Sequence, residues 1–368
     1  MVKLSEKFIS IILCLAILMA IFIPNFLFCY AADESADVAS GVAVSEENFP
    51  DKGFREYISK FIDDNEDGYL SQSEIDSFEV FSPRWHDLPS AIKSLEGIAY
   101  FKNLKILDCS IIQIQSLDVS QNTALEELVI FDSQLTDLDV SNCPKLKTLK
   151  CTHTQLTSLD VSKNTALESL LIYKTQISEL NLGKNNSLKT LKAGDTLISE
   201  LDVSNCPNLV WLSCENTNIT ALDVSKNTAL EQLMVSNTLI SELDVRNCSK
   251  LLHIFCHNTN LTSLDLSKCK NLKSVNCDNN NIEVLNLKNN HKLNYVYASN
   301  STVILSATTF LKYKINQKMP GNMGYVIAIS PTVLFSTNTT VNAFCNFAAN
   351  IIAGILAPIF MVLGIRPS

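Results

Sequence analysis

The residues best suited to chemistry lie in one short acidic stretch, residues 63–74. Side chains that carry oxygen donors occur at alternate positions in its first half, and a glutamate closes it. Calcium in proteins prefers oxygen ligands, which include carboxylates, amide and backbone carbonyls, and water held by a hydroxyl group. The sequence therefore predicts a calcium site formed by Asp63, Asn65, Asp67, the carbonyl of Tyr69, Ser71 and Glu74.

Helices on both sides of this stretch would hold the donors around one ion. Apolar residues recur at helical spacing over residues 49–62, with Asn48 as the predicted N-cap. A second short helix is predicted from Ile75, and Gly68 stands where the loop must turn sharply. The pattern resembles a single EF-hand, so residues 48–91 are predicted to be an EF-hand-like helical cap.

After the cap, a 21-residue phrase that begins at Leu104 is repeated nine times without insertion or deletion, and a tenth copy fades after Leu305. Such self-similarity is typical of a repeat architecture. Each copy contains two runs of apolar residues at period two, which predicts two extended runs joined by turns. Identical coils stack in parallel about 4.8 Å apart. Residues 92–305 are therefore predicted to form a flattened solenoid of parallel strands.

The phrase LTSLDVSKNTALESL resembles the internalin-like leucine-rich repeats of secreted bacterial surface proteins, and the resemblance covers roughly residues 45–305. It implies an α/β leucine-rich-repeat solenoid that is mostly β, presents a concave sheet and carries a small helical cap. Such arrays are scaffolds whose ligand, a protein or a glycan, is set by exposed positions. The alternative is a recruitment module of a secreted enzyme or effector.

The first run of each coil presents a face that folding does not require to be apolar. Its third, fifth and seventh positions point away from the core by strand alternation. Aromatic residues and methionine flanked by lysines are typical of interface anchors. We name these residues the sheet face and predict that they bind the ligand: Phe131, Lys150, Leu171, Tyr173, Lys192, Trp211, Met234, His253, Phe255, His257, Tyr295 and Tyr297.

Three further ladders run along the repeats. Threonine recurs at the ninth position, as at Thr154, where it is predicted to satisfy the backbone groups of a turn. Aspartate recurs at the fifteenth, as at Asp202, where turn capping is predicted and a cation-binding stripe is the alternative. In four coils a cysteine at the nineteenth position is followed eight residues later by another, as in Cys206 and Cys214. A disulfide and two small buried thiols both fit this coupling.

The two ends of the chain differ from the repeats in composition. Residues 1–32 combine an early positive charge with a long apolar run, which predicts a signal peptide, with an uncleaved signal anchor as the alternative. Residues 33–47 are small and acidic and are predicted to be a linker. Residues 306–368 include an uncharged segment, 343–365, that is long enough to span a membrane. A buried C-terminal cap is the alternative for this segment. The protein is therefore predicted to be secreted or held at the cell surface.

Composition and motifs argue against two function classes. The formal net charge is −9, which disfavours nucleic acid as a partner. No nucleophile elbow, phosphate loop or zinc motif occurs in the sequence. His253 and His257 are four residues apart in a predicted strand, about 13 Å, which is too far for one metal ion. The sequence therefore predicts a non-enzymatic binding protein with calcium as its only cofactor.

Overall fold

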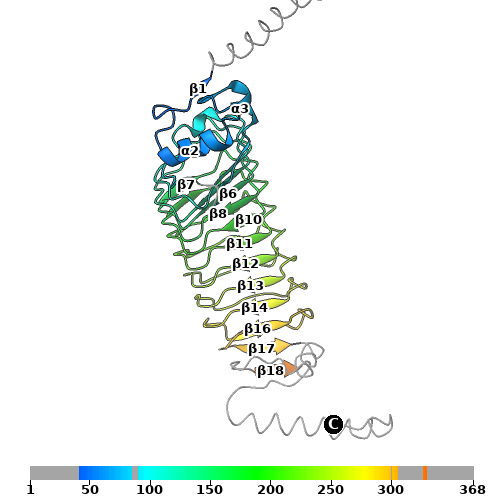
Figure 1. Ribbon diagram of the computed structural model, residues 1–368. Helices are drawn as coiled ribbons and strands as arrows, with labels where there is room; N and C mark the ends of the chain where they lie inside the picture. The colour runs from blue at the N-terminus through cyan, green and yellow to red at the C-terminus, as the bar shows by residue number, and fades with distance from the viewer. Residues whose placement is uncertain (1–40, 85–89, 300, 306–325, 330–368) are drawn as a thin grey trace, which may run out of the picture.

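The computed structural model describes residues 41–84, 90–299, 301–305 and 326–329. These residues stack into one long solenoid with a small helical cap at its N-terminal end (Figure 1). The strands of successive coils lie side by side along one flank of the stack. The predicted architecture, a mostly β solenoid of parallel strands with few helices, is confirmed.

One parallel sheet of 11 strands runs along the solenoid. Each strand within the repeats pairs with its counterpart 21 residues away, so that Leu191 lies beside Leu212 and Leu212 beside Leu233. In chain order the strands are β3 (Val80–Phe81), β4 (Ile106–Cys109), β5 (Glu127–Phe131), β6 (Thr148–Thr152), β8 (Ser169–Leu171), β10 (Thr190–Lys192), β11 (Trp211–Ser213), β12 (Gln232–Met234), β13 (His253–Phe255), β14 (Ser274–Asn276) and β16 (Tyr295–Tyr297).

The core lies between the two runs of each coil. In one coil the buried apolar residues are Leu209, Leu212, Cys214, Ile219, Leu222 and Val224. Burying one leucine or valine side chain contributes roughly 1.5–3 kcal/mol, and in a solenoid this burial depends on the neighbouring coils. Gln232 and Met234, on either side of the buried Leu233, point to the opposite face and are half-buried. The strand alternation that defines the sheet face is therefore present in the structure.

The second run of the coils is less regular than predicted. Among the described residues it forms strands only as β7 (Ser158–Asp160), β9 (Glu179–Asn181), β15 (Val284–Asn286) and β17 (Thr302–Leu305). In other coils a backbone hydrogen bond, such as Asn218 N to Ile198 O at 3.0 Å, joins neighbouring second runs near their start. Further along the second run, side chains accept hydrogen bonds from backbone amides of their own coil. These amides therefore cannot donate to the neighbouring coil in a β-ladder. The prediction of two strands in every coil is wrong for these coils.

The solenoid extends past Leu305, the predicted end of the repeats. Strand β18 (Val326–Ile329) pairs in parallel with β17, which in turn pairs with β15. Val303 lies beside Leu285, eighteen residues earlier, so the 21-residue period is lost here although stacking continues. No helix within the described residues is long and apolar enough to cross a membrane. The candidate segment 343–365 and the predicted signal peptide, 1–32, lie outside those residues.

The cap contains α2 (Lys52–Phe61), α3 (Gln72–Ser77), the 3-10 helix η1 (Ile98–Tyr100) and the paired strands β1 (Val42–Ala43) and β2 (Tyr69–Leu70). The prediction that Asn48 caps α2 is wrong, because Asp51 accepts a hydrogen bond from the Phe54 amide at 2.8 Å. The other oxygen of Asp51 accepts from the amides of Lys93 and Ser94, so one carboxylate satisfies two segments. Strand β1 also shows that the predicted linker, 33–47, is ordered at its end.

Aromatic rings join the cap to the first coil. Phe49 and Phe54 are fully buried with ring centroids 5.9 Å apart. Phe54 packs edge-on against Phe81 of β3 at 5.8 Å, and Phe49 stacks on Phe101 at 6.4 Å. Because β3 is the first strand of the 11-stranded sheet, the cap covers the edge that the first coil would otherwise expose.

Candidate functional site

The predicted calcium loop lies between α2 and α3, and backbone amides hold its carboxylates. Asp63 accepts from the amides of Asp67 and Gly68 at 3.2 and 3.0 Å. Glu74 accepts from two amides at 2.7 Å, one of which belongs to Ser71, the N-cap of α3. Asp63 and Glu74 are both buried, so two charged donors are already withdrawn from water.

The donor chemistry of this loop fits calcium. Burial raises the pKa of Asp63, and repulsion from Asp67 and Glu74 raises it further, against the opposing effect of its hydrogen bonds. A cation between these carboxylates would relieve the repulsion. Gly68 has a left-handed φ of 80°, as the turn requires. Across the described residues, no three or more His, Cys, Asp or Glu side chains are gathered closely enough to hold a metal ion. The carboxylates would therefore have to close on calcium as it binds.

Strand β1 is paired with the second half of the loop. Val42 lies opposite Leu70 and Ala43 opposite Tyr69 in an antiparallel pair. The amide of Val44 donates to the carbonyl of Gly68 at 2.9 Å. The shape of the loop is therefore coupled through backbone hydrogen bonds to the segment that precedes the cap. A strand of two residues is too short to show periodicity, so β1 could not be predicted from the sequence.

The structure places all the predicted sheet-face residues on the outward side of the 11-stranded sheet or directly after its strands. Phe131, Tyr295 and Tyr297 are exposed, with 40%, 49% and 37% of their surfaces accessible. The others are half-buried against their neighbours. Lys150 is paired with Glu127 at 2.9 Å, which neutralises part of the predicted positive flank.

Aromatic rings form a row at the N-terminal end of the sheet face. His153 lies between Phe131 and Tyr173, with ring centroids 5.1 and 5.8 Å away. Strand alternation does not predict His153 as part of this face, because His153 stands one position beyond the alternating strand residues. Its φ of 56° turns the chain into the left-handed region at that point. The three rings form one continuous aromatic patch across three coils.

A second cluster lies at the middle of the sheet face. The Lys192 ammonium lies over the Trp211 ring, 3.7 Å from its centroid. The indole Nε1 of Trp211 is buried and has no hydrogen-bond partner among the described residues. A buried indole N–H usually finds an acceptor. Movement of the Lys192 side chain would uncover a ring face beside a donor that has no partner among the described residues.

Two histidines belong to a third cluster. The rings of His253 and Phe255 lie 6.5 Å apart. Burial lowers the pKa of His253, with a smaller contribution from Lys273, so this ring is neutral at pH 7. The Nδ1 of His257 shares a 2.8 Å hydrogen bond with the Ser236 hydroxyl. This part of the face is therefore rich in aromatic and imidazole rings.

The interior ladders satisfy the turns. The Thr217 hydroxyl donates to the Cys214 carbonyl at 2.7 Å, which confirms the role predicted for the ninth position. At the nineteenth position, the side-chain amide of Asn227 donates to the carbonyls of Val203 and Cys206 in the preceding coil, at 2.9 and 2.8 Å. Each such asparagine ties its coil to the one before it.

The cysteines of the described chain are all free and buried, so the interpretation as small interior thiols is confirmed and no disulfide joins them. Cys248 takes the place of an asparagine, and its thiol contacts the carbonyls of Val224 and Asn227 at 3.7 and 3.8 Å. Burial raises the pKa of Cys248 to about 11, and Asp244 adds to this effect. A protonated, buried thiol is unreactive.

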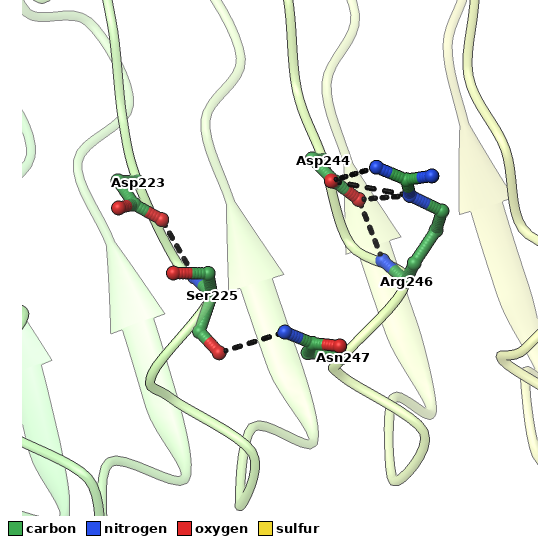
Figure 2. Close-up of polar contacts among 5 residues, drawn as sticks. All are labelled: Asp223, Ser225, Asp244, Arg246 and Asn247. Carbon is green, nitrogen blue, oxygen red and sulfur yellow. Dashed lines mark hydrogen bonds and ion pairs between the residues drawn. The ribbon is translucent and has the colours of Figure 1, made fainter.

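The aspartates of the fifteenth position cap turns, as predicted. Asp223 accepts from the amide of Ser225 at 2.8 Å, and Asp244 accepts from the amide and the guanidinium of Arg246 (Figure 2). The side chain of Asn247 reaches back to the Ser225 carbonyl of the preceding coil at 3.1 Å. These carboxylates are engaged by local donors, which favours the capping role over a cation-binding stripe.

These caps should make the solenoid sensitive to acid. The Ser225 amide lowers the pKa of Asp223, and the Arg246 side chain lowers that of Asp244 to about 2. A carboxylate whose pKa is lower in the folded state than in the unfolded state stabilises the folded state. This stabilisation is complete above the unfolded-state pKa of about 4, and it is lost as the pH falls through the folded-state pKa. We expect the Tm to fall between about pH 4 and pH 2 in calorimetric scans.

Asp244→Asn provides the control for this prediction. It should lower the Tm at pH 6, and its difference from the wild type should shrink toward pH 2, where Asp244 itself becomes protonated. A Tm that stays constant from pH 5 to pH 2 would contradict a stabilising role for these caps.

Comparison with known proteins bears on the fold. A scan against protein-family models and a search of curated proteins gave no match. Among solved structures, the functional domain of InlJ from Listeria monocytogenes, described as including a cysteine ladder, superposes with a TM-score of 0.58 at 24% identity. That match covers 79% of this chain and 71% of the other.

Two further structures are similar. The internalin InlF of Listeria monocytogenes superposes with a TM-score of 0.60 at 19% identity, over 80% of this chain and 94% of the other. A leucine-rich-repeat protein of Leptospira interrogans gives 0.54 at 18% identity, over 66% and 70%. Together with the 21-residue register of the sheet, these likenesses show that the chain has an internalin-like leucine-rich-repeat fold.

Proposed function

We propose that this protein is an exported, non-enzymatic recognition module that binds a protein partner on its sheet face. The observation that carries the proposal is the set of outward-facing aromatic side chains, exposed at Phe131, Tyr295 and Tyr297, on a face whose folding needs only the buried alternate residues. Residues 1–32 would direct export and 343–365 would tether the protein to a membrane. The likeness in fold to internalins supports a surface role.

The sheet face has the size and chemistry of a protein interface. Eleven strands at about 4.8 Å span roughly 50 Å, which is enough for the standard interface of about 800 Å² on each partner. Its centre is aromatic and carries the Lys192 ammonium over the Trp211 ring, while Lys150 is paired with Glu127. Such desolvated aromatic centres carry most of the energy in protein interfaces.

Trp211 is the best single anchor on this face. The Lys192 ammonium lies over its ring, and its indole N–H has no partner among the described residues. A partner that displaces the lysine and supplies a carbonyl or carboxylate would satisfy both the N–H and the ammonium. We therefore expect an acceptor group of the partner to lie beside Nε1 at the edge of the Trp211 ring.

Capture with a matched bait tests the proposal. The secreted protein and its Tyr173→Ala/Trp211→Ala/Phe255→Ala variant would be immobilised separately and exposed to surface-protein extracts. The proposal expects at least one protein to be retained by the wild type and not by the variant. Retention of the same proteins by both baits would contradict the assignment of the sheet face.

The cap is proposed to bind one calcium ion. Asp63, Asn65, Asp67 and Glu74 would supply side-chain oxygens, with the Tyr69 carbonyl and a water at Ser71. The repulsion among the three carboxylates that raises the pKa of Asp63 would then be relieved. Strand β2 lies within the loop and pairs with β1, so calcium binding would also stabilise that strand pair.

Calcium is expected to stabilise the cap, and Glu74→Gln to abolish the effect. At a concentration of 100 times the Kd, a bound ion adds about 2.7 kcal/mol to the stability of the unit that holds it. Titration calorimetry measures the binding, and amide exchange at Val44, whose N–H donates to Gly68, measures the protection of β1. Asp64 is an exposed residue of the same loop and is not a predicted calcium ligand, so the Asp64→Asn variant should bind calcium as the wild type does. Absence of calcium binding by the wild type would refute this part of the proposal.

A further inference from the structure

A row of hydrogen-bonded polar side chains, one aspartate followed by four asparagines, runs along the rim of the sheet at the eighth position of five successive coils. Each amide nitrogen donates to the side-chain oxygen of the preceding coil, at 2.9, 2.7, 2.6 and 2.7 Å in chain order. All the members are exposed. We name this set the amide row: Asp195, Asn216, Asn237, Asn258 and Asn279.

The amide row leaves hydrogen-bonding groups free in a regular array. A side-chain amide has two N–H donors and an oxygen with two lone pairs. The inner members Asn216, Asn237 and Asn258 each use one donor and one lone pair within the row. Each coil therefore offers one further donor and one further acceptor to solvent, repeated about every 4.8 Å.

The backbone does not require a continuous row of amides. Every member has a left-handed φ between 54° and 55°, a conformation that asparagine tolerates well. Asp132, His153 and Lys174 adopt the same conformation, with φ of 50° to 57°, at the same position of earlier coils. The uninterrupted run of amides in the later coils is therefore an additional feature of the surface.

The surroundings of the amide row disfavour an anionic ligand. The flanking seventh and tenth positions of these coils contain no lysine or arginine, and they include the acidic residues Glu215 and Asp278. Anionic polymers such as nucleic acids and acidic polysaccharides would be repelled. Leu197 and Leu239, at the tenth position, are 50% and 54% exposed and offer apolar contact beside the amides.

The spacing distinguishes between two kinds of polymer. A peptide strand repeats its outward groups every two residues, about 6.8 Å, and would fall out of register with the coils. In an extended chain of 1,4-β-linked sugars, alternate rings are turned over, so equivalent groups recur every second ring, at nearly two coil spacings. Each hydroxyl both donates and accepts. We propose that the amide row binds a neutral 1,4-β-linked polysaccharide along the solenoid axis, with one sugar per coil. This site is separate from the protein-binding function proposed for the sheet face.

Oligosaccharide titration tests this proposal. Cellobiose through cellohexaose would be titrated into the full-length protein by calorimetry, with maltohexaose, whose 1,4-α linkages curve the chain, as the geometric control. We expect affinity to rise with length up to about five sugars, to match the five coils of the row, and maltohexaose to bind at least tenfold more weakly.

Glycine substitutions separate recognition from folding. Asn237→Gly removes the central amide without straining the left-handed backbone and should weaken cellohexaose binding at least tenfold. Asp132→Gly makes the same change at the same position outside the row and should bind as the wild type does. No binding of cellohexaose by the wild type, or equal binding by Asn237→Gly, would overturn the proposal. Either result would leave the protein-capture test on the sheet face unaffected.

Discussion

Replacing Asn227 by alanine is expected to lower the free energy of unfolding by about 3 kcal/mol. The Asn227 side chain is fully buried and donates to the carbonyls of Val203 and Cys206. Alanine would leave both carbonyls without this donor, at a cost of about 1–3 kcal/mol for each group that stays dry, and would open a cavity. Urea unfolding followed by circular dichroism measures the change.

The chain itself supplies the matched control for this substitution. Cysteine occupies the same position in other coils, where Cys248 and Cys269 direct their thiols at two carbonyls of the preceding coil. Asn227→Cys should therefore cost clearly less than Asn227→Ala. It also removes the Asn227 Oδ1, which has no hydrogen-bond partner among the described residues. A cost below about 1 kcal/mol for alanine, or equal costs for both, would contradict the role assigned to this ladder.

Replacing Trp211 by alanine is expected to weaken partner binding by about 2 kcal/mol or more, which is roughly thirtyfold in Kd. The half-buried ring lies at the centre of the sheet face, outside the leucine core, and its contact with Lys192 is lost on substitution. That contact contributes about 0.5–1 kcal/mol at an exposed site, so stability should change little. Surface plasmon resonance with the captured partner, beside a thermal melt, measures both effects.

Two substitutions serve as controls for Trp211. Thr190 occupies the adjacent place in β10, directly paired with Trp211, and Thr190→Ala alters the same face without removing an aromatic ring. Asp202 lies on the second run, where it caps the Ser204 amide, and Asp202→Asn should leave the affinity unchanged. Equal loss from Trp211→Ala and Asp202→Asn would indicate general destabilisation.

The repeat architecture was predictable because the apolar pattern of the repeats allows only one pairing of neighbouring strands. A strict 21-residue period places Leu191 beside Leu212 and Leu212 beside Leu233, and no other register stacks like residues on each other. Polar ladders followed for the same reason, since Thr217 and Asp223 satisfy groups within their own turn. Local hydrogen bonds of this kind depend on sequence neighbours alone.

Features that depend on distant contacts were not predictable. Asp51 replaces Asn48 as the cap of α2 because it also accepts from the amides of Lys93 and Ser94, far along the chain. Strand β1 is defined by its partner β2 rather than by its own composition. Strand β18 lies beyond the end of the repeat period, so periodicity could not find it.

The position of the sheet face could be predicted from the sequence, but the contacts among its side chains could not. Strand alternation correctly placed Trp211, Phe255 and Tyr297 on the outward side of the sheet. It could not show that Lys192 covers the Trp211 ring, or that His153 completes a row with Phe131 and Tyr173. Those contacts join side chains in different coils and depend on rotamers, which sequence periodicity does not specify.

The central claim is that the outward side chains of the first run recognise a protein. Its most direct test is the affinity of the captured partner for the Tyr173→Ala/Trp211→Ala/Phe255→Ala variant, measured beside the wild type at matched thermal stability. We predict a loss of more than a hundredfold in affinity with the Tm nearly unchanged, because three anchors are removed and the buried leucines are kept. An affinity equal to that of the wild type would show that the partner binds elsewhere and would contradict the assignment.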